Sequence, residues 1–572
     1  MRRSSSRPFC SRRFLVLLCC VATTLTIMYQ WQTLLHSTSQ EDVVSRLHGA
    51  NESDIFPTKL STTSIPSLTE EEFYQGFSEL PKPSSLKSEP LSIINNNVTF
   101  PRRSQVAPEQ LYAMRERHVA KLQSIITDPL PKFWQYNTEQ LRALIEAWKN
   151  VGKDGNFQQP GVVLSSYGYV PCVMKRPVCS TTGEVIWLES VTNVFKEQGY
   201  FLLYDEFENL GNAYKFYGDI VTHVWSSEPQ VVWCINDPIS CIQSEDNPDG
   251  IKIWQLFTFT FWGSPPGFGT FYAPNHPWSY NPLGREWNLV PYQMPDRHFY
   301  LGYHFTGCED MIAVPRAQRK DQIVILAKRS EYFHYAGLFK PEFWTPFKQG
   351  LPGLELISVS NEEEGYPVPE ELTLLGPQER HAYDLLLGTS KALFGIGRPK
   401  ISPTPFASLC RGVPVVLPYD GRYCTAVPDV NQSEWCGFHG IFHQHGAAAA
   451  LGEPYVYMVN SQGPVDDIIK TVQRAVDTPI EPFQPPEMTH ESLTQRIRDY
   501  FSIDWQDYGR QRLIESGWDS WESIRTQEYL HRYVAESEKQ GKRIAQLPPG
   551  QYLPTGQWEQ YQKQRQKSTK TS

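Results

Sequence analysis

The stretch Phe394-Gly-Ile-Gly-Arg-Pro-Lys-Ile-Ser-Pro-Thr-Pro-Phe-Ala-Ser-Leu-Cys-Arg-Gly-Val-Pro-Val-Val-Leu-Pro418 contains the clearest fold signal in the chain. It predicts a strand over 392–396 that ends in a Gly-x-Gly turn, a proline-rich loop, a short helix from about residue 404, and a buried strand over 413–417. Glycines let the backbone approach a ligand closely, and unpaired N–H groups at a helix start attract phosphate. An ordinary tight turn explains a lone Gly-x-Gly equally well. The turn therefore indicates a phosphate site only in combination with the helix and strand that follow it.

Alternating strands and helices flank this stretch. In the same half of the chain, strands are predicted over 322–327, 354–359 and 455–459, and helices over 379–388 and 465–476. In the earlier half, strands are predicted over 162–165, 200–204, 230–235 and 299–305, and a helix over 185–198. Two successive arrays of this kind predict an α/β fold with two Rossmann-like domains that face a cleft, since open parallel sheets bind ligands at the carboxyl ends of their strands.

The composition agrees with a folded body and disfavours one class of partner. Of 572 residues, 40% are hydrophobic and 20% are charged, as in ordinary globular proteins. The net charge is −9, although the first 13 residues hold five arginines and no acidic residue. The rest of the chain is therefore strongly acidic, which argues against nucleic acid as a partner. The aromatic content of 13% suits either a large core or a cleft that stacks on sugars.

The N-terminal segment predicts a membrane anchor. The arginines precede an uncharged run over 14–35, long enough to cross the ~30 Å hydrocarbon core of a bilayer. Basic residues stay on the cytosolic side, so everything after the anchor is expected in the lumen or outside the cell. We expect a single-pass type II protein with an uncleaved signal anchor; a cleaved signal peptide is the alternative.

The predicted organisation follows the chain from one end to the other. It consists of a cytosolic tail (1–13), a transmembrane anchor (14–35), a disordered Ser- and Pro-rich stem (36–107), a helical lead-in (108–155), a first Rossmann-like domain (156–315), a second one (316–480), C-terminal helices (481–540) and a loose tail (541–572). Within the lead-in, helices are predicted over 108–126 and 138–149.

Cysteine usage indicates an oxidising compartment. Eight cysteines follow the anchor, an even number that fits disulfides. Cys172 with Cys179, and Cys424 with Cys436, are plausible local pairs, and the full connectivity stays open.

Two further patterns occur in the predicted lumenal part. The sequons at Asn51, Asn97 and Asn431 are compatible with N-glycosylation. His439, His443 and His445 follow Cys436 closely and make zinc a weaker alternative, because glycines inside the cluster favour a loop.

The quoted stretch resembles a known family. Gly395-Ile-Gly397, Pro403-x-Pro405, Gly412 and Leu417-Pro418 are similar to the donor-binding segment of glycosyltransferase family 18, the α-1,6-mannosylglycoprotein 6-β-N-acetylglucosaminyltransferases (N-acetylglucosaminyltransferase V). The similarity extends over about residues 160–502 and includes Leu493–Ile497 and, upstream, Gly284–Pro291, the latter similar to a Trp-Asn-Leu-x-Pro segment of the family.

The resemblance implies an architecture and an activity. It implies a Golgi membrane enzyme of GT-B type that transfers N-acetylglucosamine from UDP-N-acetylglucosamine to a mannose hydroxyl of glycoprotein N-glycans. The transfer inverts the anomeric centre and makes a β-1,6 linkage. Its partners would be a nucleotide sugar, a glycoprotein glycan and, through one N-terminal helix, the membrane.

Such a reaction needs a carboxylate that takes the acceptor proton. Gly183-Glu184 resembles the family segment that supplies this base, so Glu184 is the predicted catalytic residue. A glutamate favoured by the helix dipole in a first turn is the competing interpretation. Asp205, Glu206 and Asp237, at predicted strand ends, are the alternative bases.

Donor and acceptor residues follow from the same resemblance. The predicted donor-binding residues are Lys328, Gly376, Gly395, Gly397, Pro403, Pro405 and Phe406, with Arg329 and Arg398 as further cations. The predicted acceptor-binding residues are Trp287 and Asn288, and the aromatic run from Trp262 to Tyr272 is a second candidate for stacking on sugars. The sequence has no D-x-D, so we expect no metal and no cofactor beyond the donor substrate.

One departure from the family pattern leaves alternatives open. Ile401 and Ala407 stand where the family has carboxylates, the second of which is expected to bind ribose. The chain would then use another nucleotide sugar, or it would be a catalytically inactive, membrane-tethered glycan-binding protein on the same fold.

Overall fold

The computed structural model describes much of the chain between residues 100 and 515. It leaves out residues 105, 128–133, 154–156, 175–181, 264–279, 295–296, 306–307, 309–313, 335–336 and 427–441 within that range. The predicted anchor and the sequons at Asn51, Asn97 and Asn431 lie outside the described residues. Within them, no helix combines the length and the apolar character that a bilayer crossing requires.

The first sheet has six parallel strands. They are β1 (Val162–Ser165), β2 (Phe201–Tyr204), β3 (His223–Ser226), β4 (Leu256–Phe259), β5 (Asn288–Val290) and β6 (Phe299–Tyr300), in the spatial order β2-β1-β3-β4-β5-β6. Strands β1 to β5 are buried along their whole length, which accounts for their runs of apolar residues.

The second sheet repeats this plan. Its strands are β7 (Gln322–Leu326), β8 (Glu355–Ser358), β9 (Thr373–Leu374), β10 (Ala392–Gly395), β11 (Val415–Tyr419) and β12 (Val456–Asn460), in the order β12-β11-β10-β7-β8-β9. Every pairing in both sheets is parallel. The α/β class with two parallel sheets, as expected of the GT-B type, is therefore confirmed.

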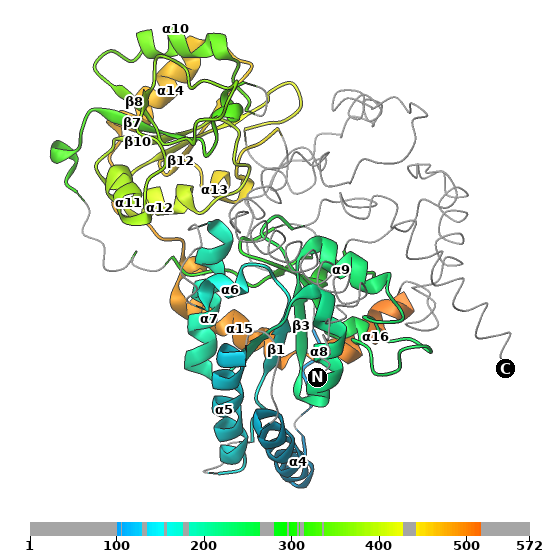
Figure 1. Cartoon of the computed structure of the whole chain (residues 1–572). Helices are drawn as coiled ribbons and strands as arrows, with labels where there is room; N and C mark the ends of the chain where they lie inside the picture. Colours follow the sequence, from blue (N-terminus) through cyan, green and yellow to red (C-terminus); the bar gives the residue numbers. More distant parts are fainter. Residues whose placement is uncertain are drawn as a thin grey trace, which may run out of the picture. The chain divides into compact units, whose positions relative to one another are not determined.

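Helices connect and cover the strands (Figure 1). Around the first sheet they are α4 (Pro108–Thr127), α5 (Trp134–Asn150), α6 (Val170–Val173), α7 (Gly183–Gln198), α8 (Leu210–Tyr217) and α9 (Glu228–Ile235). Around the second they are α10 (Trp344–Gln349), α11 (Arg380–Gly388), α12 (Thr404–Cys410), α13 (Gly446–Ala449) and α14 (Val465–Asp477). Helix α7 lies in the connection from β1 to β2, and α8 lies in the connection from β2 to β3. These two connections run in opposite directions across the first sheet. Because such connections are right-handed, the two helices lie on opposite faces of the sheet.

The chain returns to the first sheet after the second is complete. Helix α15 (His490–Ser502) packs against α7, and α16 (Trp505–Glu515) follows it. The indole N–H of Trp225 in β3 donates to the Tyr500 hydroxyl at 2.8 Å, and the Tyr508 hydroxyl donates to Glu286 Oε1 at 2.8 Å. The C-terminal helices are thus part of the core of the first half.

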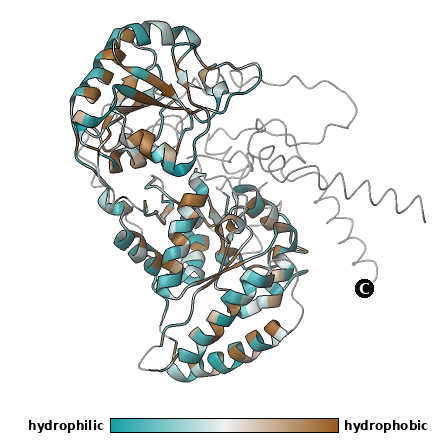
Figure 2. Ribbon diagram, turned by 60° about the vertical axis from the view of Figure 1, so that its left-hand side comes forward, coloured by the Kyte–Doolittle hydropathy of each residue, from teal (hydrophilic) through white to brown (hydrophobic). Residues whose placement is uncertain are grey.

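Hydrophobic residues concentrate on the strands and on the inward helix faces (Figure 2). One core extends from the first sheet to one side of the second, where it includes Phe406 and Leu417. A separate core fills the other side of the second sheet, beneath α10 and α14, and includes Trp344 and Val472.

One strand prediction is wrong. Residues 230–235 form most of α9, and the strand is β3, which ends at Ser226. The β-branched residues of this segment favour a strand, but the start signals of a helix outweigh them. Pro229 lies in the first turn, where its missing N–H costs nothing, and Gln230 Oε1 accepts the Ser227 N–H at 3.2 Å.

Disulfides are present, as predicted, and two have both partners among the described residues. Cys234 bonds Cys241 just after α9, and Cys308 bonds Cys410 at the end of α12. Cys172 and Cys424 are also disulfide-bonded. Their predicted partners, Cys179 and Cys436, lie outside the described residues.

Candidate functional site

Glu184 lies in the first turn of α7. Thr182 caps this helix, its hydroxyl oxygen accepting the Val185 N–H at 3.4 Å. A carboxylate in this position is favoured by the helix dipole. The Glu184 side chain is half-buried, so it combines access from solvent with a partly apolar surrounding.

The surroundings of Glu184 are the loops at the carboxyl edge of the first sheet. Burial and the charge of Glu184 raise the pKa values of Tyr167 and Tyr169, which follow β1. A methyl group built on Gly183 would lie 2.8 Å from the Phe261 ring, which follows β4. Glu184 is therefore held where ligands of parallel sheets bind.

A second carboxyl group, that of Glu228, lies at the same edge. It opens α9 directly after β3, and the Thr260 hydroxyl donates to its Oε1 at 2.5 Å. Burial and the charge of Glu184 raise the pKa of Glu228, although the Thr260 hydrogen bond acts in the opposite direction. Two acidic groups thus lie at this edge of the sheet, and burial disfavours the ionised form of Glu228.

The predicted donor loop of the second half meets this edge. The methyl group built on Gly183 would also lie 3.0 Å from Pro403 Cδ. The Phe406 ring stacks on Tyr292, with centroids 5.5 Å apart, and His445 contacts both rings. The structure therefore brings Pro403 of the predicted donor loop next to Gly183, the neighbour of Glu184, although the two segments are more than 200 residues apart in the sequence.

The structure requires a glycine at both positions of the Gly-x-Gly turn. Gly397 has φ +100, which only glycine adopts without strain, and its N–H donates to Gln444 Oε1 at 2.9 Å. A Cβ on Gly395 would lie 2.1 Å from the same oxygen. Because Gln444 already accepts the Gly397 N–H, that group is not available to a phosphate in this conformation.

The other predicted donor residues share the carboxyl edge of the second sheet. Lys328 follows β7, and Gly376, with φ +71, follows β9. Lys328 is exposed, whereas Pro405 is buried within α12. No described contact joins Lys328 or Gly376 to Glu184.

Arg329 is engaged elsewhere. Its guanidinium pairs with Glu331 at 2.9 Å and with Glu363 at 2.6 Å. Burial lowers its pKa, but the hydrogen bond to Glu363 and the charges of both carboxylates outweigh burial and raise it. With its charge compensated in this way, Arg329 is a weaker candidate for a diphosphate than Lys328.

Trp287 and Asn288 do not lie on a surface that a sugar reaches. Both are fully buried, and the Trp287 ring packs against Trp505 and Tyr508 of α16. Its indole N–H donates to the Trp254 carbonyl at 3.0 Å. This placement gives Trp287 a packing role, in place of the acceptor contact predicted from sequence.

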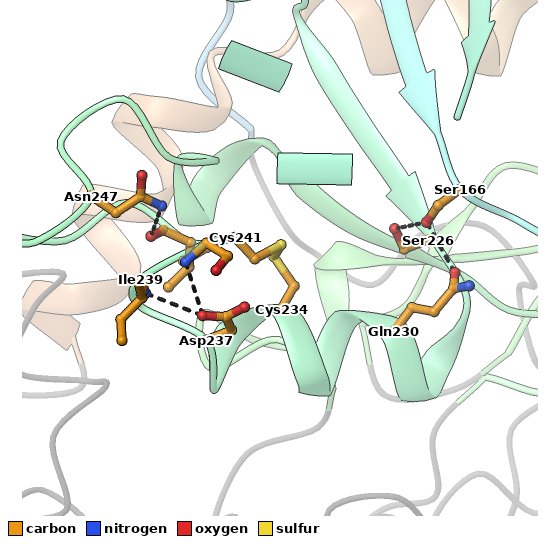
Figure 3. The surroundings of a disulfide bond; sticks show 10 residues. Ser166, Ser226, Gln230, Cys234, Asp237, Ile239, Cys241 and Asn247 are labelled. Carbon is orange, nitrogen blue, oxygen red and sulfur yellow. Dashed lines mark hydrogen bonds between the residues drawn. A yellow bond between two sulfur atoms is a disulfide. The ribbon is translucent and has the colours of Figure 1, made fainter. Parts of the chain in front are cut away.

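Two alternative bases have structural roles in turns. Asp205 accepts the Glu206 N–H and an amide N–H of Asn209, and Asp237 accepts the backbone N–H groups of Ile239 and Ser240 (Figure 3). The third, Glu206, is half-buried.

Two of the three histidines considered as zinc ligands form hydrogen bonds with backbone carbonyl groups. His443 bonds the Ala426 carbonyl and His445 the Ser402 carbonyl, while His439 lies outside the described residues. Across the residues that the structure does describe, no group of three His, Cys, Asp or Glu side chains has the arrangement of a metal site.

Part of the second half of the chain is similar to a known protein family. The model of glycosyltransferase family 18 matches residues 356–544. Alpha-1,6-mannosylglycoprotein 6-beta-N-acetylglucosaminyltransferase A from Homo sapiens and from Cricetulus griseus are each 23% identical over 239 residues, which is 39% of this chain and 30% of each relative. The predicted resemblance to family 18 is thus confirmed for this region, and the chain matches about a third of the length of these relatives.

Solved structures give weaker likenesses. A glycotransferase of kitacinnamycin is 13% identical with a TM-score of 0.30, covering 63% of this chain and 100% of that chain. A mutant O-GlcNAc transferase from Thermobaculum terrenum is 12% identical with a TM-score of 0.32, covering 69% and 78%. Both TM-scores are too low for these likenesses to bear on function.

Sequence reasoning missed Glu228 and Thr260 at this edge. The wrong strand over 230–235 placed Glu228 before a strand instead of after one. The signal that identifies it is Ser227-Glu-Pro-Gln230, a helix start that follows directly on a buried strand.

Proposed function

We propose that the chain is an inverting glycosyltransferase that moves N-acetylglucosamine from UDP-N-acetylglucosamine to a mannose hydroxyl of a glycoprotein N-glycan, in β-1,6 linkage. The main observation in support is the approach of Pro403 of the donor loop to Gly183, the residue before Glu184. This approach brings a segment that is similar to family 18 close to the carboxylate at the carboxyl edge of the first sheet. The match to family 18 over residues 356–544 supports the donor side.

The proposed reaction is a single displacement. A Glu184 carboxylate oxygen takes the proton of the acceptor hydroxyl as that oxygen attacks the anomeric carbon. The bond between the anomeric carbon and the diphosphate breaks, and its electron pair leaves with UDP. Lys328, exposed at the edge of the second sheet, is the proposed partner of the departing charge.

The experiment measures transfer by the full-length protein from UDP-N-acetylglucosamine to a mannose-terminated oligosaccharide. Glu184→Gln keeps the size of the side chain but removes the base, so we expect kcat to fall about 10²–10⁴-fold. Glu197→Gln, on the same helix beside His490, is the matched control and should retain wild-type kcat. A Glu184→Gln variant as active as the control contradicts the proposal.

A second candidate function rests on Ile401 and Ala407. Both are buried apolar residues where the family resemblance leads one to expect carboxylates, so a ribose contact there has no acceptor atoms from these side chains. A glycosyltransferase for another nucleotide sugar, or an inactive glycan-binding protein, fits this departure. Thermal shift against a panel of nucleotide sugars separates the three: stabilisation by UDP-N-acetylglucosamine, by another donor, or by none.

The proposed enzyme is a type II Golgi membrane protein with a lumenal catalytic region, and it works without metal. The arginine-flanked run over 14–35 and the sequons support the location. The lack of a D-x-D sequence supports the second point. Transfer that persists in excess chelator, and a loss of apparent mass on treatment with an N-glycosidase, are the expected results.

A further inference from the structure

Gln444 and His445 are buried polar residues to which the sequence assigns no role in donor binding. They lie between β11 and α13, and each retains only 1% of its surface. Burying a polar side chain is costly unless its hydrogen bonds are satisfied. All but one of the described partners of these two side chains belong to the donor segment, which we define as residues 397–402, from the second glycine of the Gly-x-Gly turn to the residue before Pro403.

The Gln444 amide fits into the Gly-x-Gly turn. Its Oε1 accepts the Gly397 N–H at 2.9 Å, and its Nε2 donates to the Pro399 carbonyl at 3.0 Å. A Cβ on Gly395 would lie 2.1 Å from the same Oε1, so the missing side chain of this glycine makes room for the amide. Both glycines of the turn thus accommodate Gln444, and the Gly397 N–H fixes the backbone of the donor segment.

His445 holds the end of the donor segment. Its backbone N–H donates to the Lys400 carbonyl at 2.7 Å, and its Nε2 bonds the Ser402 carbonyl at 2.5 Å. The His445 backbone has φ 50 and ψ 60, a left-handed conformation that is uncommon outside glycine. Such conformations persist where the surrounding structure requires them, and they are concentrated at functional sites.

The two residues are themselves anchored to regular elements. The Gln444 N–H donates to the Pro418 carbonyl of β11 at 3.1 Å, and the His445 carbonyl accepts the Ala448 N–H of α13 at 2.9 Å. Binding groups are held precisely when the residues that support them are fixed by the scaffold. The pair is therefore suited to act as a template for the backbone of the donor segment.

His445 also connects the donor segment to the first half of the chain. Its ring contacts Phe406 of α12 at a centroid distance of 5.4 Å and Tyr292, which follows β5, at 5.0 Å. The Phe406 and Tyr292 rings stack on each other. A change at His445 therefore reaches both the donor segment and a ring at the carboxyl edge of the first sheet, whereas the side-chain bonds of Gln444 reach the donor segment alone.

We propose that Gln444 and His445 are positioning residues for a nucleoside diphosphate: they hold the donor segment in the conformation that binds this ligand, without touching it themselves. The inference rests on the proposed function for the identity of the ligand. It replaces the phosphate-binding interpretation of the Gly-x-Gly turn, because the turn binds Gln444 and the segment beyond it meets the ligand.

The first experiment measures the dissociation constants of UDP and GDP from the full-length protein by isothermal titration calorimetry. Gln444→Met keeps the approximate size of the side chain but removes both bonds to the donor segment, so we expect the dissociation constant of the bound nucleotide to rise at least tenfold. Gln322→Met is the matched control, because Gln322 is a buried glutamine that bonds Ser390 at 2.9 Å and lies at the amino end of β7, the opposite edge of the second sheet. It should stay within twofold of wild type.

Urea unfolding of the two variants separates positioning from stability. Both variants lose buried hydrogen bonds, so both should unfold at lower urea concentrations than wild type, but only Gln444→Met should lose nucleotide affinity. A Gln444→Met variant that binds like the control overturns the positioning role, and so does a wild-type protein that binds neither UDP nor GDP.

His445→Asn tests the second residue of the pair. Asparagine suits the left-handed backbone at this position but is too short to reach the Ser402 carbonyl, so we expect the nucleotide dissociation constant to rise at least threefold. A value within twofold of wild type overturns the role of His445.

Hydrogen exchange measures the donor segment directly, without a ligand. Gln444→Met should speed the exchange of backbone amides within residues 394–402 at least fivefold, and Gln322→Met should leave it unchanged. Equal exchange in the two variants contradicts a positioning role for Gln444.

The transfer assay separates this inference from the proposed function. Gln444→Met should raise KM for UDP-N-acetylglucosamine at least tenfold with the acceptor KM within twofold, whereas Glu184→Gln lowers kcat. Transfer with an unchanged donor KM in Gln444→Met overturns the positioning role and leaves the proposed function intact. Nucleotide binding that Gln444→Met weakens, in a wild-type protein without transfer, supports the positioning role and contradicts the proposed function.

Discussion

His445 bonds the backbone of the donor loop, and its protonation affects how the stability of the protein depends on pH. Its Nδ1 accepts the Ala448 N–H at 3.3 Å, and Nε2 therefore donates to the Ser402 carbonyl at 2.5 Å. This arrangement needs the neutral ring, and burial lowers the pKa of His445 to about 4. The unfolded chain, with a histidine pKa near 6.5, binds a proton in a range where the folded chain does not.

Stability should therefore fall as pH drops from about 6.5 towards 4, because protons favour the unfolded state in this window. Between pH 7 and 4.5 the wild-type protein should lose about 2–3 kcal/mol more than His445→Asn, which does not titrate and suits the left-handed backbone at φ 50. Urea denaturation at the two pH values measures the difference. Equal losses would show that His445 does not carry this dependence.

Gly397 gives a second test at a single residue. A Cβ there would lie 2.9 Å from the Leu338 backbone N and would require a strained φ, whereas Gly452, with φ +65, has open space around it. Gly397→Ala should cost more than Gly452→Ala, which bears only the backbone cost of about 1–3 kcal/mol. Urea unfolding of both variants checks this, and equal costs would exclude the contact with Leu338.

The hydrogen bond between Tyr500 of α15 and Trp225 of β3 provides a test of how α15 stabilises the first sheet. Tyr500 is fully buried, and its hydroxyl is the acceptor for the indole N–H of Trp225. Tyr500→Phe leaves a buried donor without that partner, so we expect a loss of about 1–3 kcal/mol in the free energy of unfolding. Tyr112→Phe, at a 37% exposed residue, is the control and should change it by less than about 0.5 kcal/mol. Similar losses in both variants would argue against a dominant role for this bond.

Most elements were predictable, and the exceptions have two causes, a local helix start that was overlooked and the packing of distant segments. Periodicity located α14, and fully apolar runs located β7, β10 and β11, because parallel strands are buried on both faces. It misassigned α9, whose inner face is as apolar as a strand and whose type is decided by Pro229 and Gln230 at its start. For the candidate site, the approach of Pro403 to Gly183 depends on the packing of distant segments, which no local pattern contains. The burial of Trp287 depends in the same way on α16.

At the scale of the whole molecule, the Cys308–Cys410 bond joins the segment after the first sheet to α12 of the second. It closes a loop with a sequence separation of 102, against 7 for Cys234–Cys241. The chain-entropy model then expects the double variant Cys308→Ser/Cys410→Ser to lose about 2 kcal/mol more stability than Cys234→Ser/Cys241→Ser. Denaturant unfolding of the two variants under oxidising conditions tests this, and the reverse order of stabilities contradicts it.

The return of α15 and α16 to the first sheet has a consequence for biosynthesis. The ribosome delivers β1 to β6 early, but the rings that cover them, Tyr500 and Trp505, emerge some 200 residues after β6. At about 5–20 residues per second, the nascent first half waits roughly 10–40 s with part of its aromatic interior uncovered. The part of the chain that is translated first is thus among the last to complete its core, and a chain truncated before α15 leaves that aromatic interior uncovered.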